Sequence, residues 1–176
     1  VEVQRLLAAA LQLPTDRSSS ALRPWTFHCL LGLLSVTGLR ISEALDLKLG
    51  DVDMQQAVLT IHAAKLGRSR LVPLHSTTCA VLAEYMRRRE DFLGSRDSNY
   101  LFVSTKGTRL DGGRVHRAFY ELSRQTGLRA PGVSRGPRLH DFRHNSGTRI
   151  IPSSASADVR PSEVTVSSDG YRCSEL

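Results

Sequence analysis

The sequence predicts a mainly helical α+β domain with one small antiparallel β-sheet. Two observations support this fold class. Apolar residues recur at helical spacing in most segments, whereas residues 57–75 alternate apolar and polar positions on both sides of a short basic loop. With 176 residues the chain is long enough to bury one core, so we expect a single globular domain.

The N-terminal part of the chain is expected to form three helices. The first covers residues 1–13 and ends before Pro14. The second covers residues 21–38, where Gly38 can adopt the positive φ that often ends a helix. A short helix over residues 41–47 follows at once, so we expect a tight connection between the two.

The alternating stretch predicts a β-hairpin. Its strands are "AVLTIHA" at 57–63 and "SRLVPLH" at 69–75, and the intervening "AKLGR" forms the loop. Residues 51–56 precede the hairpin and are expected to form a turn. The hairpin would therefore present a loop that carries Lys65.

The C-terminal half returns to helical patterns. Residues 76–94 predict an amphipathic helix, residues 99–104 a short strand, and residues 114–128 a second amphipathic helix. Residues 138–150, "RLHDFRHNSGTRI", form the last segment with a helical pattern. Residues 151–176 are rich in Ser with scattered Pro, and we expect them to be a disordered tail because they cannot bury enough apolar surface.

The charge balance points to a polyanionic partner. The formal net charge of +7 favours nucleic acid over a membrane surface. The longest apolar run, residues 29–39, is about half of the roughly 20 residues that span a bilayer, and no export signal is visible. We expect a cytoplasmic protein without disulfides or a zinc ribbon, because the cysteines are odd in number and far apart: Cys29, Cys79 and Cys173.

Two basic residues stand at positions suited to an anion. Arg40 begins the short helix, where backbone N–H groups favour negative charge. Alternatively, Arg40 pairs with Glu43 one turn later and has no further role. Lys65 can project from the hairpin loop toward a ligand, or it can simply be solvated.

A third group lies in "LHDFRH". His140 and Arg143 are three residues apart on one helix face, so an acid/base group and a bidentate phosphate ligand would approach one substrate together. Alternatively, His140 is buried in the core and Arg143 pairs with Asp141 or Glu43. A zinc helix is a further alternative, because His140 and His144 are four residues apart. Asp141 is shorter than the Glu that such a helix requires, and no third ligand is evident, so we expect no metal.

Three segments in this order resemble the catalytic domain of the tyrosine recombinases, also called phage-type integrases. They are "TGLRISEALDLKLGDVD", "KLGRSRLVPL" and "LHDFRH", and the similarity covers about residues 1–150. The resemblance implies a family that breaks and rejoins DNA through a 3′-phosphotyrosyl intermediate, without metal or nucleotide cofactor, as a tetramer on two duplexes. We therefore expect site-specific recombination, integration or transposition of a mobile element, with double-stranded DNA and intact recombinase protomers as partners.

The same resemblance implies roles for individual residues. Arg40 and Arg143 would hold the nonbridging phosphate oxygens, and Lys65 would protonate the leaving 5′-hydroxyl. His140 would hydrogen-bond the phosphate or take the proton of the nucleophile, and Glu43 would keep Arg40 in place. The further basic residues expected to contact DNA phosphates are Arg68, Arg70, Arg87, Arg88, Arg89, Arg114 and Arg117.

The C-terminal part of the sequence departs from the family. No "Leu-Gly-His" follows His144, and Tyr171, the one tyrosine after Arg143, comes somewhat early in an unsuitable setting. We expect that a frameshift within or just after "NSGTRI" produced residues 151–176. Because the chain starts with Val, we also expect that an upstream part is missing, the alternative being an unusual start codon. The expected function is that of a truncated, inactive tyrosine recombinase. The alternative is a non-catalytic DNA-binding module that competes with or regulates an intact recombinase.

Overall fold

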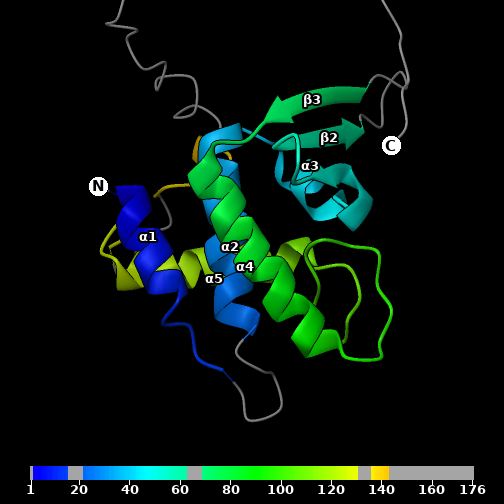
Figure 1. Cartoon of the computed structure of the whole chain (residues 1–176). Coiled ribbons are helices and arrows are strands. Elements are labelled where there is room, and N and C mark those ends of the chain that lie inside the picture. The colour runs from blue at the N-terminus through cyan, green and yellow to red at the C-terminus, as the bar shows by residue number, and fades with distance from the viewer. Residues whose placement is uncertain (1, 16–21, 63–68, 131–135, 143–176) are drawn as a thin grey trace, which may run out of the picture.

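The computed structural model describes residues 2–15, 22–62, 69–130 and 136–142. These residues form a mainly helical fold with a three-stranded antiparallel sheet, which confirms the predicted fold class (Figure 1). No helix among them is long and apolar enough to cross a membrane. A single core runs through this part of the chain and includes residues from every helix of more than one turn.

Helix α2, Leu22–Thr37, occupies the centre of the helical part (Figure 1). Its leucines between positions 30 and 34 are almost fully buried, because α1 (Glu2–Ala10) and α4 (Ser76–Leu93) pack against it. Gly38 ends α2 with φ of +63°, as expected. The short helix α3, Ile41–Asp46, follows immediately. The 3-10 turn η1, Leu49–Asp51, comes after α3.

The sheet contains the predicted hairpin and one strand that the sequence did not indicate. Strands β2 (Val58–His62) and β3 (Ser69–Pro73) pair from Val58 with Pro73 to His62 with Ser69. Residues 51–56 were expected to be a turn, but β1, Val52–Asp53, pairs with β2. The Asp53 carboxylate accepts hydrogen bonds from the next backbone N–H groups, at 2.8 and 2.9 Å, and so closes a turn short enough to return the chain alongside β1.

Arg89 of α4 was expected to contact DNA phosphates, but its side chain is buried. The Arg89 side chain is only 4% exposed. Its Nη2 donates to the carbonyls of Ser98 and Tyr100 at 2.6 and 2.7 Å, and its Nε donates to Tyr100 at 3.0 Å. The chain turns back along α4 after Gly94, so these carbonyls face the helix. Burial lowers the pKa of the guanidinium, and the carbonyls stabilise the buried cation.

The segment 99–104 does not form the strand that its composition predicted. It makes only isolated bridges, Lys48 with Tyr100 and Val103 with Arg109. Because each bridge joins this segment to a different part of the chain, no continuous ladder can extend along it. The segment is nevertheless part of the core, with Leu101 and Phe102 fully buried.

Helix α5, Gly112–Gln125, contacts α1 and α3 and confirms the second amphipathic helix. The chain after it returns to the core at Leu139 and Phe142, which are 6% and 7% exposed. The Phe142 ring packs edge-on against Phe119 of α5, with 5.8 Å between ring centroids. Of the helix predicted over 138–150, Asp141 and Phe142 are helical, residues 138–140 are not, and residues 143–150 lie outside the described residues.

Candidate active site

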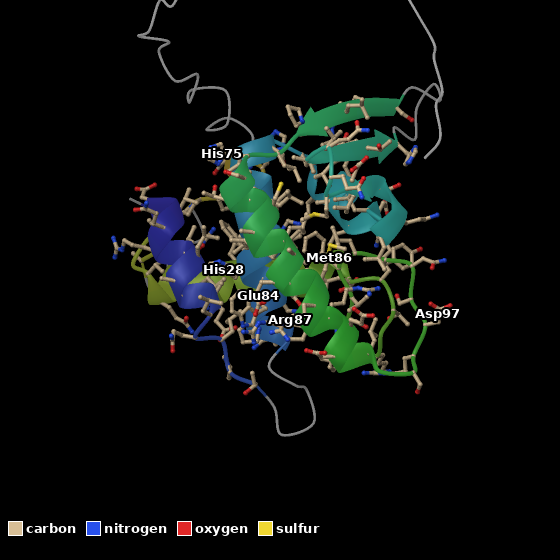
Figure 2. All side chains as sticks on the ribbon, viewed as in Figure 1. His28, His75, Glu84, Met86, Arg87 and Asp97 are labelled. Atoms are coloured by element: carbon tan, nitrogen blue, oxygen red, sulfur yellow. The ribbon has the colours of Figure 1, made fainter. Side chains whose placement is uncertain are left out.

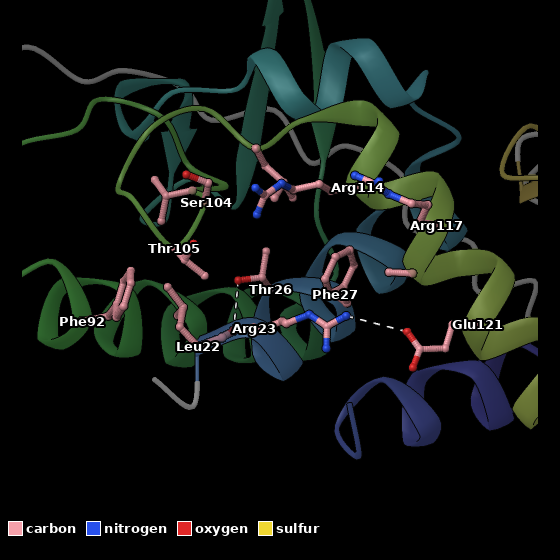
Figure 3. Close-up of a pocket in the computed structure, with 13 residues that line it drawn as sticks. Leu22, Arg23, Thr26, Phe27, Phe92, Ser104, Thr105, Arg114, Arg117 and Glu121 are labelled. Atoms are coloured by element: carbon pink, nitrogen blue, oxygen red, sulfur yellow. Dashed lines mark hydrogen bonds and ion pairs between the residues drawn. The ribbon is translucent and has the colours of Figure 1, made fainter. Parts of the chain in front are cut away.

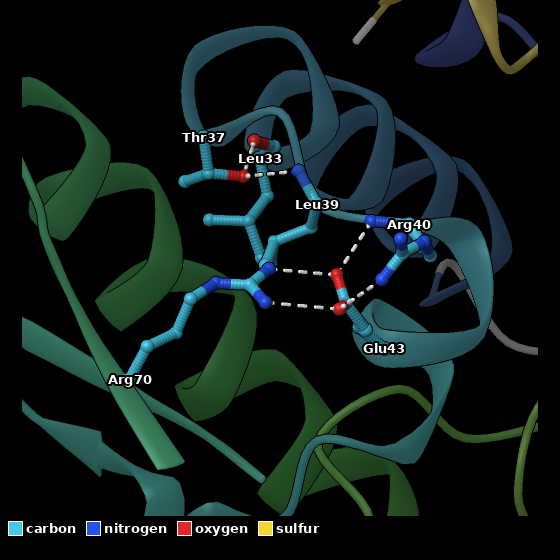
Figure 4. Close-up of polar contacts among 6 residues, drawn as sticks. All are labelled: Leu33, Thr37, Leu39, Arg40, Glu43 and Arg70. Carbon is cyan, nitrogen blue, oxygen red and sulfur yellow. Dashed lines mark hydrogen bonds and ion pairs between the residues drawn. The ribbon is translucent and has the colours of Figure 1, made fainter. Parts of the chain in front are cut away.

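Arg40 and Glu43 form one unit at the start of α3 (Figure 4). The Glu43 carboxylate accepts the backbone N–H of Arg40 at 2.8 Å, which satisfies one of the N–H groups that a helix start leaves unpaired. Nη1 of Arg40 also donates to Glu43 at 3.3 Å. The Arg40 side chain is still 61% exposed, so most of its N–H groups face solvent rather than protein.

Arg70 of β3 is the second arginine that binds Glu43. Its two terminal nitrogens donate to the two carboxylate oxygens at 3.1 and 2.8 Å, in the parallel bidentate geometry that a guanidinium favours. Figure 4 shows the Glu43 carboxylate between the two guanidinium groups. The Glu43 side chain is only 10% exposed.

The environment of Glu43 keeps its carboxylate ionised. Burial by itself raises the pKa, but the hydrogen bonds from Arg70 and from the Arg40 backbone, together with the two positive charges, lower it below its ordinary value. A negative charge held in this way fixes the positions of both arginines. Sequence spacing indicated the contact with Arg40 but not the one with Arg70, which lies 27 residues away.

The hairpin loop that carries Lys65 and Arg68 lies outside the described residues, so their roles stay predictions. The residues on both sides of the loop are held to each other and to η1. Nδ1 of His62 lies 3.1 Å from the Ser69 hydroxyl, and Nε2 of His62 lies 3.0 Å from the Asp51 carboxylate. The base of the loop is therefore attached to the segment that directly follows α3.

His140 is exposed, which excludes the alternative that it is buried in the core. Its neighbours Leu139 and Phe142 hold this turn against the core instead. The Asp141 carboxylate accepts the backbone N–H of Arg138 at 2.7 Å and so caps the turn. Arg143 lies outside the described residues, so the predicted pairing of His140 with Arg143 stays a prediction.

The arginines expected to contact DNA have different surroundings. On α4, Arg87 pairs with Glu84 and Asp91, each at 3.0 Å. Figure 2 labels Arg87 and Glu84 on this helix. Arg88 also pairs with Glu84, at 2.7 Å, and its guanidinium lies 4.2 Å from the centre of the Trp25 ring.

Arg114 and Arg117 are exposed on α5, and within the described part of the chain neither makes a side-chain hydrogen bond or ion pair. The two helices therefore differ: acidic neighbours on α4 pair with Arg87 and Arg88, whereas no carboxylate of the described residues pairs with Arg114 or Arg117 on α5.

Residues 2–15, 22–62, 69–130 and 136–142 contain no group of three His, Cys, Asp or Glu side chains that could hold a metal ion. The zinc alternative involved His140 and His144, and His144 lies outside these ranges. That alternative is therefore not tested.

The chain belongs to the phage integrase family, whose sequence pattern matches residues 1–160. Together with the predicted motifs, the match identifies this fold as a tyrosine recombinase catalytic domain.

Several recombinases are similar to this chain in sequence. A protein of Sinorhizobium fredii named as an integrase/recombinase, y4rB, is 54% identical over 151 residues, which is 85% of this chain and 48% of that protein. The tyrosine recombinase XerD of Bifidobacterium longum is 32% identical over 166 residues, 90% of this chain and 50% of that protein. The chain thus spans about half the length of these curated relatives.

Solved recombinase structures share the fold. A crystal structure of XerA recombinase superimposes with a TM-score of 0.67 and 24% identity, over 88% of this chain and 50% of that one. The catalytic core of lambda integrase superimposes with a TM-score of 0.58 and 24% identity, over 82% of this chain and 77% of that one.

Proposed function

We propose that this domain cleaves and rejoins DNA strands in site-specific recombination or integration by a mobile element. The observation that carries the proposal is the Arg40–Glu43–Arg70 cluster, in which a nearly buried carboxylate holds an exposed Arg40 at a helix start. The names of similar proteins support it, since they include integrases, recombinases and a lambda integrase bound to DNA.

The chemistry of the cluster fits phosphoryl transfer. A transition state whose charge is spread over phosphate oxygens is stabilised by cations that are already in place. Glu43 holds Arg40 at one point and leaves other N–H groups of its guanidinium for a phosphate. In this proposal Arg143 completes the clamp, Lys65 protonates the leaving hydroxyl and His140 acts on the phosphate or the nucleophile, without metal or cofactor.

Double-stranded DNA is the proposed partner, and other recombinase protomers complete the assembly in the cytoplasm. Arg68 and Arg70 belong to the same hairpin as Lys65 and are proposed to contact the phosphates next to the scissile one. Arg87 and Arg88 are proposed as weaker contacts, because a phosphate would compete with Glu84 for them.

We further propose that the 176-residue chain by itself does not cleave DNA. The support is in its sequence: residues 151–176 contain no "Leu-Gly-His", and Tyr171 lies in "SSDGYRCSEL". A nucleophile that is not held in line with the phosphate loses the benefit of positioning. The catalytic unit would then be residues 1–150, and a partner protomer would have to supply the tyrosine.

The test uses a nicked duplex that traps covalent protein–DNA adducts. The chain alone should form none. A full-length relative that keeps its tyrosine, but in which the arginine that corresponds to Arg40 is replaced, should form an adduct when this chain is added. In the same assay, Arg40→Ala should lower adduct formation about 100-fold or more, and Arg124→Ala, an exposed arginine of α5, should have no effect.

The outcomes separate the candidate functions. If the relative still forms the adduct when the added chain carries Arg40→Ala, a catalytic role of this chain is contradicted. That result would support a non-catalytic DNA-binding module. An adduct formed by the chain alone and mapped to Tyr171 would contradict the proposed inactivity.

A further inference from the structure

A pocket of about 330 Å³ opens at the N-terminal end of α2, between α2, the end of α4, the segment 103–105 and α5 (Figure 3). A volume of this size is typical of ligand sites. Its apolar lining comes from Leu22, Phe27, Phe92, Val103, Leu110 and Ala118. Such a surface favours an apolar group over water.

The polar lining of the pocket is dominated by cations. Arg23, Arg114 and Arg117 line it, against one carboxylate, Glu121. The ion pair between Arg23 and Glu121 is long, at 3.7 Å, and Arg23 also donates to the carbonyl of Pro14 at 2.8 Å. The lining thus carries two more positive than negative charges.

Two hydroxyl groups of the lining are already bonded within the protein. Thr26 donates to the Leu22 carbonyl at 3.0 Å, and Ser104 is hydrogen-bonded to Thr108 at 2.9 Å. The guanidinium groups of Arg114 and Arg117, which project from α5 (Figure 3), have no such partner among the described residues. A ligand would therefore be recognised by an anionic group beside an apolar one.

The pocket is separate from the candidate active site. Arg23 lies in the first turn of α2, whereas Arg40 follows the last turn of this 16-residue helix. The helix is about 24 Å long at 1.5 Å per residue. A duplex phosphate is also fully solvated and has no apolar group to place in the recess.

We propose that this pocket binds an acidic peptide segment of a partner protein, with one apolar side chain in the recess and its flanking carboxylates on Arg114 and Arg117. The charge complementarity and the apolar lining are both met by such a segment. This inference does not depend on the proposed function, because it needs neither DNA nor catalysis. The duplex contacts that the sequence suggested for Arg114 and Arg117 are the competing assignment.

The test measures binding of fluorescein-labelled peptides to the full 176-residue chain by fluorescence anisotropy. The probe is acetyl-Asp-Glu-Phe-Asp-Glu-amide. One control replaces Asp and Glu with Asn and Gln, and a second replaces Phe with Ala. We expect saturable 1:1 binding of the probe and at least tenfold weaker binding of both control peptides.

Variants assign the binding to the pocket. Arg114→Ala and Arg117→Ala should each weaken binding about fivefold, and Glu121→Gln should strengthen it. Arg124→Ala removes the same charge from the same helix outside the lining and should change nothing. All these side chains are at least partly exposed, and circular dichroism checks that each variant is folded.

Each other result contradicts the proposal. Equal binding of the Phe and Ala peptides would show charge attraction alone, and equal losses in Arg114→Ala and Arg124→Ala would place the binding elsewhere. Displacement of the peptide by a 20-base-pair duplex that depends on Arg114 and Arg117 would assign these arginines to DNA instead.

Discussion

Similar charged groups lie near the two ends of helix α2, but in different arrangements. Beyond its C-terminal end, Glu43 is 10% exposed and contacts Arg40 at 3.3 Å and Arg70 at 2.8 Å. At its N-terminal end, Glu121 is 42% exposed and pairs with Arg23 at 3.7 Å. The first carboxylate binds its arginines tightly, whereas the second leaves most of the positive charge around it uncompensated.

This difference shows how burial of the carboxylate decides what neighbouring arginines can do. A nearly buried carboxylate competes well against water and fixes the geometry of a guanidinium, which suits a site that must be preorganised. An exposed carboxylate is screened by water and salt, so nearby cations stay available to a ligand. This difference is consistent with our proposals that the cluster at one end of the helix serves catalysis and the cluster at the other binds a ligand.

The largest expected effect comes from removing the buried carboxylate. Glu43→Ala should lower the free energy of unfolding by about 2 kcal/mol, because Arg70 loses two hydrogen bonds and the start of α3 loses its cap. Glu121→Ala should change it by less than about 0.5 kcal/mol. Urea denaturation measures both, and equal losses would show that the two ends do not differ.

Acid should reduce the stability that the ionised Glu43 carboxylate contributes to the fold. The pKa of Glu43 is lower in the folded chain than its ordinary value of 4.5, so the folded state favours the ionised form. The resulting stability is present above about pH 4.5 and is lost as the pH falls through the lower, folded-state pKa. Denaturation curves recorded between pH 6 and pH 3 should show a smaller loss in Glu43→Gln than in the unchanged chain. A parallel loss in both would exclude this linkage.

Arg70→Lys tests the bidentate geometry with the charge kept. Lysine cannot make two parallel hydrogen bonds to one carboxylate, so we expect a loss of about 1 kcal/mol in the free energy of unfolding. Arg114→Lys serves as the matched control and should be neutral. If Arg70→Lys is neutral as well, the positive charge alone holds Glu43.

The smallest effect is expected at the pocket. The double variant Arg114→Ala/Arg117→Ala should change the free energy of unfolding by less than about 0.5 kcal/mol, because neither side chain pairs with a described residue. Thermal unfolding followed by circular dichroism measures it. A large loss would mean that these arginines support the fold rather than a ligand.

Local patterns predicted much of the fold. Helical spacing identified the helices, and alternation identified the pairing of β2 with β3. The sequence did not reveal β1, because a two-residue strand is too short to show any period. Composition likewise suggested a strand at 99–104, but strand formation depends on a continuous neighbour, which this segment lacks.

The sequence also predicted the candidate site only in part. The spacing of Arg40 and Glu43 predicted their contact, whereas the burial of Arg89 could not be seen in a run of three arginines. Helical periodicity separates one face from another, but it does not show that a later segment brings its carbonyls to a guanidinium.

By itself, the sequence determined the order of the main helices, the hairpin and the family motifs, because these depend on neighbouring residues and local backbone preferences. Only the tertiary structure decided which arginines are held and which are available. Glu43 and Arg70 are 27 residues apart, and Arg23 lines the same pocket as Arg114 and Arg117 only because the fold brings α2 and α5 together. The ionisation and pairing of each charged group depend on its burial and on partners from distant segments. Those surroundings exist only once the chain has folded.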